Sequence, residues 1–266
     1  MNDQRTGVSY GPREVALANE ILRSVVGSGV HGVAIPGTDD HDEMGVFVEP
    51  RAHVYGVRPA LDQHVWRTRA EGERSRPGDT DLVIYSLRRY LRLAAKGNPT
   101  ALLPLFAPAS DVLVLTEIGA SLREVRSAFL SQDAVRRFLG FMGRQHDRML
   151  LDGQGRPELI ERDGWDTKFG AHALRLALQG WELAATGQLT LPLPAAERNQ
   201  VLAVKRGDRG HDEVSAAVVD LTRRTIAALD SGRCPLPAHA DLAVIDRWSV
   251  QAHERHWLGP ATQLSA

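Results

Sequence analysis

The sequence predicts an α+β fold in which a small mixed sheet with flanking helices is followed by an all-helical C-terminal region. In the first half, short β-type apolar runs are separated by glycine- and proline-containing connectors, as in residues 27–50. From residue 117 onward, apolar residues recur at helical spacing. The 266 residues, 43% of them apolar, suffice for one large domain or two modest ones. We expect a core over residues 1–116 and a helical domain over residues 117–266.

The first elements follow from local signals. Pro12 is placed to open a helix that ends near Ile21. Leu22–Val26 is a short apolar run that ends at the Gly27-Ser28 turn. Because glycine has no Cβ, backbone N–H groups of this turn can approach a phosphate, and the serine hydroxyl can donate a hydrogen bond as well. We therefore expect a phosphate-binding turn at the end of the first apolar run.

Two acids stand at the entrance to the next β-type run. On a strand, Asp40 and Asp42 share one face, whereas His41 and Glu43 share the other. Two close carboxylates raise each other's pKa unless a cation neutralises them, and Mg²⁺ is the usual cation when phosphates supply further ligands. Asp40 and Asp42 are thus candidate Mg²⁺ ligands. Asp39 competes with Asp40 as the first ligand, and we prefer Asp40 because it shares a face with Asp42 on a regular strand.

The remainder of the first half contains a long irregular stretch and three regular elements. Residues 51–79 show no sustained period and are expected to form turns or a loop. Asp81–Tyr85 predicts a strand, and Ser86–Lys96 an amphipathic helix that Gly97-Asn98-Pro99 ends. Asp111–Leu115 predicts a short strand that closes the sheet.

The second half predicts helices over residues 131–151, 166–176, 211–229 and 241–256, and a brief strand or turn over residues 202–207. On the second of these helices, Lys168, His172 and Arg175 lie at positions i, i+4 and i+7. These three potential cations share one stripe. Such a stripe can bind a triphosphate or its leaving pyrophosphate, although a charged stripe is equally typical of a solvated helix face.

Several motifs together resemble a known superfamily. Gly27-Ser28, eleven intervening residues and Asp40-x-Asp42 resemble the signature of the DNA polymerase β nucleotidyltransferases. The chain is also similar to the RNA-repair-pathway branch of that superfamily in four further blocks, which are His31–Pro36, Gly45–Pro50, Tyr85–Tyr90 and Lys96–Pro99. These blocks occur in order and cover about the first half of the chain. The resemblance implies a polymerase β-like nucleotidyltransferase core.

The resemblance also implies a reaction and its site. Asp40 and Asp42 would hold two Mg²⁺ ions, for which Mn²⁺ can substitute, and Gly27-Ser28 would grip the triphosphate of an NTP. Asp81 would be the third carboxylate, sharing a metal and activating the attacking hydroxyl, with Asp79 as its rival. The expected reaction transfers an NMP to a hydroxyl and releases pyrophosphate. The implied acceptor is an RNA end; a protein side chain or a small molecule is the alternative.

Two other classes of function compete with this interpretation. The branch usually has an apolar and then a basic residue after the second acid, where this chain has Glu43 and Met44. That departure, together with the choice between Asp79 and Asp81 as the third acid, leaves open a nucleotide-binding regulatory or antitoxin-like module with little or no catalysis. His146-Asp147 on a predicted helix suggests a metal-dependent phosphohydrolase as the other alternative. The separate upstream His and downstream Asp that such sites need are missing from the pattern.

Composition narrows the setting. A net charge of −1 argues against binding of long nucleic acids without regard to sequence. The same net charge is compatible with a local basic groove. The single cysteine, Cys234, cannot form an internal disulfide, and no apolar N-terminal stretch is typical of a signal peptide or membrane span. We therefore expect a cytoplasmic protein without membrane partners. The sequence does not predict the oligomeric state.

Overall fold

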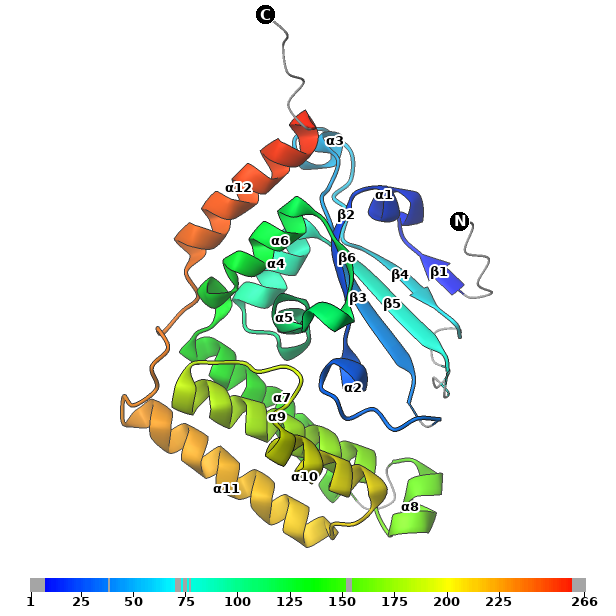
Figure 1. Ribbon diagram of the computed structural model, residues 1–266, viewed down its shortest axis with the longest axis vertical. Coiled ribbons are helices and arrows are strands. Elements are labelled where there is room, and N and C mark those ends of the chain that lie inside the picture. The colour runs from blue at the N-terminus through cyan, green and yellow to red at the C-terminus, as the bar shows by residue number, and fades with distance from the viewer. Residues whose placement is uncertain are drawn as a thin grey trace, which may run out of the picture. The chain divides into compact units, whose positions relative to one another are not determined.

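The computed structural model describes residues 8–37, 39–69, 73, 76, 78–151 and 155–259. The chain divides into two units (Figure 1). The sheet unit comprises residues 1–94, 100–128 and 241–266, and the helical unit comprises residues 95–99 and 129–240. This division differs from a single boundary after residue 116, because the helices near residues 120 and 250 group with the sheet.

Among the described residues, the sheet has six strands in the order β1-β4-β5-β3-β2-β6. Strands β3 and β5 pair in parallel, and the other neighbours pair antiparallel. The strands are β1 (Val8–Tyr10), β2 (Glu20–Val25), β3 (His41–Phe47), β4 (Gln63–Arg67), β5 (Thr80–Ser86) and β6 (Val112–Leu115). The sheet is therefore mixed, and the predicted α+β class is confirmed.

One face of the sheet packs against helix α1 (Arg13–Ala18). Ala16 of α1 forms a buried cluster with Phe47 of β3, Trp66 of β4 and two residues of β5, Leu82 and Ile84. The cluster residues on β5 alternate along the strand, as the side chains on one face of a sheet must. Burial of these apolar side chains fixes which residues of β3 and β5 turn away from α1.

On the other side of the sheet, Figure 1 shows helices α4 (Leu87–Ala95) and α6 (Glu117–Glu124). Helix α4 buries Leu87, Tyr90, Leu91 and Ala94, which recur at helical spacing. The remaining short elements of this unit are α2 (Gly27–Val30), α3 (Arg51–Val54), α5 (Pro99–Phe106) and two 3₁₀ turns, Ala109–Asp111 and Arg126–Phe129.

Helix α12 (Leu242–Leu258) returns the chain to the sheet unit. The Trp257 indole N–H donates to the Glu49 carbonyl at 2.9 Å, and the Trp248 indole N–H donates to the Ser121 hydroxyl at 3.1 Å. These long-range hydrogen bonds hold α12 against elements that are remote in the sequence. Asp241 caps the helix by accepting from the Val244 N–H at 3.0 Å.

The helical unit is built around α9 (Thr167–Thr186), which packs against α7 (Gln132–Leu150), α10 (Ala195–Arg206) and α11 (His211–Asp230). Helix α8 (Pro157–Asp163) precedes it. The Asp166 carboxylate caps α9 by accepting from the Lys168 and Phe169 N–H groups at 3.0 and 3.2 Å. Gly187 ends the helix in the left-handed conformation, with φ of +72°.

Two expectations for local structure were wrong. Residues 51–79 contain strand β4. His64 occupies a buried position of this strand, with its ring 2.9 Å from the Tyr10 carbonyl, so the sequence there lacks the alternation of apolar and polar residues that indicates a strand. Residues 202–207 belong to helix α10 and its Gly207 cap rather than to a strand, because Val201 and Val204 are buried at helical spacing. The other predicted elements of both halves are present with shifted ends.

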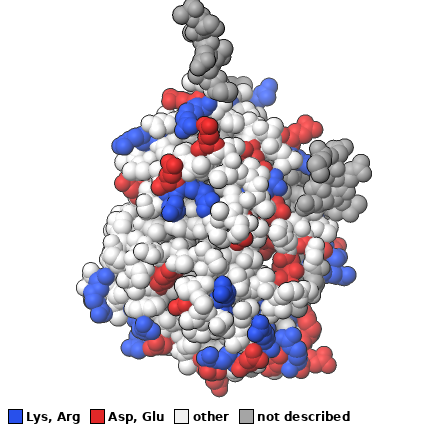
Figure 2. All heavy atoms as spheres, in the orientation of Figure 1, with Lys and Arg blue, Asp and Glu red and all other residues white. Residues whose placement is uncertain are grey.

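Charges are mixed on the molecular surface. On the face that Figure 2 shows, basic and acidic side chains are interspersed without a large patch of one sign. This agrees with the net charge of −1. No helix in the described ranges has both the length and the apolarity required to cross a bilayer.

Candidate functional site

The parallel pairing of β3 and β5 places two predicted site residues side by side. Asp42 and Asp81 are Cα partners in this register. Neighbouring strands lie about 4.8 Å apart, and paired residues of parallel strands project to the same face. Both side chains are half-buried. The sheet therefore presents two adjacent carboxylates on the face opposite to α1.

The Gly27 turn lies against the Asp42 carboxylate. The Val26 N–H donates to the Asp42 carbonyl at 2.8 Å, which joins the end of β2 to β3. Gly27 has φ of +64°, and a Cβ at this position would overlap Asp42 Oδ2. Glycine is thus required both by the backbone conformation and by the close carboxylate. Ser28 follows in the first turn of α2 and is half-buried.

The His31 ring helps to hold this turn in place. His31 is 1% exposed, and its Nδ1 contacts the Gly27 carbonyl. The ring therefore connects the end of α2 to its first residue. The structure places Gly27, Ser28 and Asp42 together in one compact arrangement at the end of β2.

Asp39 and Asp40 differ in their surroundings. The Asp39 carboxylate accepts from the Ile35 N–H at 2.6 Å and thereby closes the loop before β3. Asp40 is half-buried and directly precedes His41, the first residue of β3. The role of Asp39 in the loop supports the choice of Asp40, whose part in metal binding stays a prediction.

Asp79, the rival of Asp81, is tied into the loop before β5. Its carboxylate accepts from the Arg69 Nε at 2.5 Å and from the Arg76 N–H at 2.6 Å, and the residue is 6% exposed. The hydrogen bond from the Arg76 backbone, together with the Arg69 guanidinium, lowers the Asp79 pKa below its usual value. These contacts assign Asp79 a structural role and leave Asp81 as the candidate third acid.

Glu43, the departure from the family pattern, lies on the opposite face of β3 from Asp42. It accepts from Arg23 Nη1 at 3.1 Å, and His41 Nε2 lies 3.2 Å from its other oxygen. Arg23 also donates to both oxygens of Glu20, at 2.8 and 2.6 Å. Burial raises the Glu20 pKa. The extra acid is thus compensated by Arg23, a partner that the sequence analysis missed because it lies on a neighbouring strand.

Lys168, His172 and Arg175 lie on α9 in the helical unit. The His172 ring reaches solvent, yet desolvation by the surrounding protein and nearby cations, Arg175 and Lys168 among them, lower its pKa to about 3. Burial lowers the Arg175 pKa to about 10. His172 is therefore neutral at neutral pH, so the stripe carries two positive charges rather than three. Its approach to the acids of the sheet unit stays a prediction.

The Arg175 guanidinium has a fixed neighbour within α9. Arg175 Nη1 donates to the Gln179 Oε1 at 2.9 Å. The sequence analysis missed Gln179, although its i, i+4 spacing from Arg175 on a helix is the signal that indicates such a pair. Gln179 holds one end of the guanidinium and limits its rotamers.

The donor set at the sheet suits a metal ion that takes further ligands from its substrate. Within the described ranges, no three His, Cys, Asp or Glu side chains form a cluster that could hold an ion. Mg²⁺ is commonly bound by one or two carboxylates together with substrate phosphates and waters. The adjacent carboxylates of Asp42 and Asp81 fit that requirement, whereas a site built from protein side chains alone does not.

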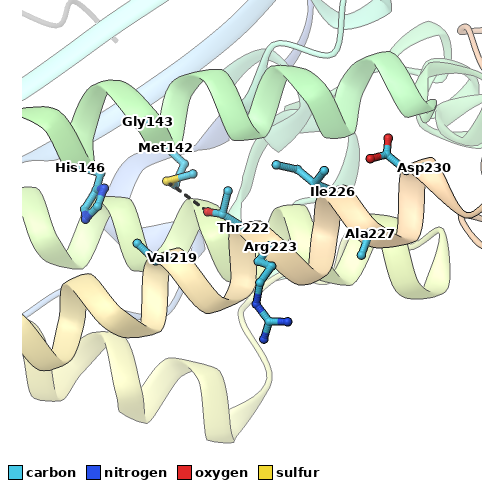
Figure 3. Close-up of a pocket in the computed structure, with 9 residues that line it drawn as sticks. All are labelled: Met142, Gly143, His146, Val219, Thr222, Arg223, Ile226, Ala227 and Asp230. Carbon is cyan, nitrogen blue, oxygen red and sulfur yellow. Dashed lines mark hydrogen bonds between the residues drawn. The ribbon is translucent and has the colours of Figure 1, made fainter.

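A large groove lies elsewhere, between α7 and α11 of the helical unit (Figure 3). Its volume is about 520 Å³, and mostly apolar side chains such as Met142, Val219 and Ile226 line it. His146 lies at one end, with its Nε2 2.9 Å from the Ser215 hydroxyl. The groove includes none of the predicted site residues, and no observation there supports a phosphohydrolase at His146-Asp147.

Comparison with known proteins identifies the family of the chain. The model of the family described as RlaP, RNA repair pathway DNA polymerase beta family, matches residues 14–249. No curated protein matches the chain. Among solved structures, the chain is similar to a nucleotidyltransferase-like protein from Exiguobacterium sibiricum 255-15, with 13% identity and a TM-score of 0.29. That alignment covers 92% of this chain and 74% of the other.

Proposed function

Because the chain belongs to the RNA repair pathway DNA polymerase beta family, we propose that it transfers an NMP from an NTP to a hydroxyl acceptor and releases pyrophosphate. The observation that carries this proposal is the register of Asp42 with Asp81, beside the Gly27 turn. Two adjacent carboxylates next to a glycine turn are the donor set expected where a cation and a polyphosphate meet.

The proposed roles of the acids follow from their positions. Asp42 and Asp81, with Asp40 as an additional ligand, would hold Mg²⁺ together with substrate phosphates and waters, and the bound ion would neutralise the carboxylates and stabilise the charge that develops on the phosphates. A carboxylate oxygen of Asp81 accepts the proton of the attacking hydroxyl. The hydroxyl oxygen forms a bond to the α-phosphorus, and the bond from that phosphorus to the bridging oxygen of the β-phosphate breaks. Pyrophosphate leaves with the bonding electrons.

The remaining residues bind and orient the donor in this proposal. The backbone N–H groups at Gly27-Ser28 and the Ser28 hydroxyl donate to phosphate oxygens. Lys168 and Arg175 contribute positive charge for the triphosphate or the leaving pyrophosphate, and neutral His172 contributes a hydrogen bond. The Gln179 contact pre-orients the Arg175 guanidinium for such a role.

The acceptor is proposed to be an RNA end, since the family is described by an RNA repair pathway. A protein side chain or a small molecule is the alternative acceptor, because functional sites vary on a shared fold. The net charge of −1 favours recognition of a short end over binding of a long strand.

The experiment that tests the proposal uses the purified chain, each NTP labelled at the α-phosphate, and Mg²⁺ or Mn²⁺. RNA ends, a protein mixture and small hydroxyl compounds are offered in parallel as acceptors. Pyrophosphate release in amounts equal to the labelled product supports the proposal, and the arm that gains label identifies the acceptor class. Tight NTP binding without release under every condition would instead identify a regulatory module.

A further inference from the structure

Three arginines and one aromatic residue line up on a single face of α7. Arg137, Phe141, Arg144 and Arg148 occur at positions i, i+4, i+7 and i+11, which coincide on one side of a helix. We call these four residues the α7 stripe. Its arginines are exposed, and Phe141 is half-buried. At 1.5 Å per residue the α7 stripe is about 16 Å long, so it is an extended surface rather than a site for a single ion.

The positive charge of the α7 stripe is not neutralised within the described part of the chain. There, the guanidinium groups of its three arginines form neither an ion pair nor a hydrogen bond. Asp133, one turn earlier on α7, accepts from Arg136 at 3.3 Å, and the His239 ring lies 2.6 Å from its other oxygen. Alternating charge signs are typical of a face that is only solvated, whereas the α7 stripe carries one sign.

Aromatic rings hold two of the arginines in place. The Arg144 Cζ lies 4.3 Å from the centroid of the Phe141 ring, and the Arg148 Cζ lies 5.9 Å from that of Phe169 on α9. Both distances are typical of a cation–π contact. A guanidinium stacked on a ring keeps its N–H donors available and loses less side-chain freedom when it binds an anion. These two arginines are therefore pre-oriented without an acid.

Gly140 leaves the helix surface open between two of the arginines. It lies three residues after Arg137 and four before Arg144. Among the described residues, a Cβ at Gly140 would meet nothing within 4 Å. Glycine lowers helix stability relative to alanine, and no neighbour among these residues requires it here. The open surface lets an anion approach the helix between the two guanidinium groups.

The α7 stripe ends beside the cations proposed to bind the donor nucleotide. Helix α7 packs against α9 within the helical unit. After desolvation, the charges of Arg175, Lys168 and Arg148 lower the pKa of the His172 ring on α9. A charge has this effect on a ring only when it lies close to it. The stripe therefore runs along α7 from Arg137 toward the proposed triphosphate-binding residues.

We propose that the α7 stripe binds the phosphate backbone of a single RNA strand, the one whose end accepts the nucleotide. The choice of RNA rests on the proposed function, whereas a polyanion follows from the length and single charge sign of the stripe. A strand of a duplex carries one phosphate per about 3.4 Å of axis, so about 16 Å spans several phosphates. Contacts to phosphates position the strand without reading its bases.

Binding of a fluorescently labelled single-stranded RNA to the full chain, without NTP or Mg²⁺, tests the proposal. Anisotropy titrations at several salt concentrations give the slope of log K against log salt concentration, which is about −0.7 per phosphate contact. We expect a slope of about −2 or steeper from three arginines. Arg137→Gln and Arg144→Gln should each reduce the slope by about 0.7 and weaken binding about tenfold.

Arg136→Gln is the matched control for these variants. It removes the same charge one residue away, but Arg136 is paired with Asp133 and lies about 100° around the helix from Arg137. We expect its affinity to stay within about twofold of the parent, with an unchanged slope.

A second pair of variants adds a negative charge instead of removing a positive one. Gly140→Glu places a carboxylate between two arginines of the stripe and should weaken RNA binding at least about tenfold. Gly143→Glu adds the same charge beside the groove between α7 and α11, where a Cβ also meets nothing within 4 Å in the described chain. It should weaken binding by less than about threefold, because it lies outside the stripe.

Thermal melting checks that each variant is folded, and the exposed arginine variants decide the question if a glycine variant is not. No binding of RNA by the unaltered chain, unaltered affinity in both Arg137→Gln and Arg144→Gln, or an equal loss in Arg136→Gln would overturn the proposal. Equally strong competition by polyglutamate would also overturn it and indicate an acidic protein partner. RNA binding that depends on the stripe, in a chain that transfers no nucleotide, would support this inference and refute the proposed reaction.

Discussion

Asp42 and Asp81 are register partners in the parallel pair of β3 and β5. A slip of one residue in this pairing would turn Asp81 to the face of α1, because successive side chains of a strand alternate between faces. The register is fixed by the apolar cluster of Phe47, Leu82 and Ile84, which must stay on the α1 face. The packing of one face of the sheet therefore determines which carboxylates meet on the other.

The position of Asp81 predicts a catalytic defect without loss of stability. In Asp81→Asn, pyrophosphate release should fall by at least about a hundredfold, since a metal ligand and proton acceptor is worth several kcal/mol of barrier. The melting temperature should not fall, because removing one of two adjacent acids relieves repulsion. Release assays and thermal melting check both parts. Unaltered release by Asp81→Asn would remove this residue from the site.

Replacing Asp79 should affect stability rather than catalysis, and the effect should depend on pH. Its pKa in the folded chain is below the usual value of 3.8, so the folded state favours the charged carboxylate. The stabilisation is fully present above pH 3.8 and is lost as the pH falls through the lower folded value. Asp79→Asn should melt earlier than the parent at neutral pH, and the difference should shrink on acidification below pH 3.8. A difference that grows in acid would contradict the assignment.

Gly27 and Gly37 form a matched pair for testing the glycine turn. Both have positive φ, +64° and +77°, but a Cβ would overlap Asp42 Oδ2 at Gly27 and meets nothing within 4 Å at Gly37. Alanine at either position should cost about 1–2 kcal/mol of stability from backbone strain. Only Gly27→Ala should also abolish NTP turnover, because it displaces the Asp42 carboxylate. Equal activity of the two variants in steady-state assays would refute this role of the turn.

Removing the Arg23 guanidinium should lower stability strongly, because two buried glutamates depend on it. It binds Glu20 and Glu43, whose side chains are only 5% and 8% exposed. Arg23→Met should lower the free energy of unfolding by about 3–5 kcal/mol, because both buried carboxylates lose their cation. Denaturant unfolding at neutral pH measures this loss. Combining Arg23→Met with Glu20→Gln and Glu43→Gln should recover stability; if it does not, the triad is not the cause.

The sequence predicted the features that are written in local patterns. The strand that follows Asp40, the run from Asp81, the amphipathic helix after it and the glycine turn all carry their signals in neighbouring residues. The resemblance to the polymerase β superfamily, which the family match confirms, added an expected reaction to these structural predictions. Periodicity and spacing were sufficient for these elements because each buries one continuous face.

Features that depend on pairing between distant segments could not be predicted. The register of Asp42 with Asp81, the Arg23 contact with Glu43 and the return of α12 through Trp257 all join residues far apart in the chain. Strand β4 was missed because its polar His64 occupies a buried position. No local pattern encodes these contacts, since tertiary packing determines them.

Asp42 is proposed to hold a cation for nucleotide transfer, and Mg²⁺-dependent pyrophosphate release by Asp42→Asn tests this role most directly. Glu43→Gln is the matched control, one residue along β3 and on the opposite face. We expect Asp42→Asn to be folded and to lose at least about a hundredfold in activity, while Glu43→Gln remains active. Full activity in Asp42→Asn, or equal losses in the two variants, would contradict the account.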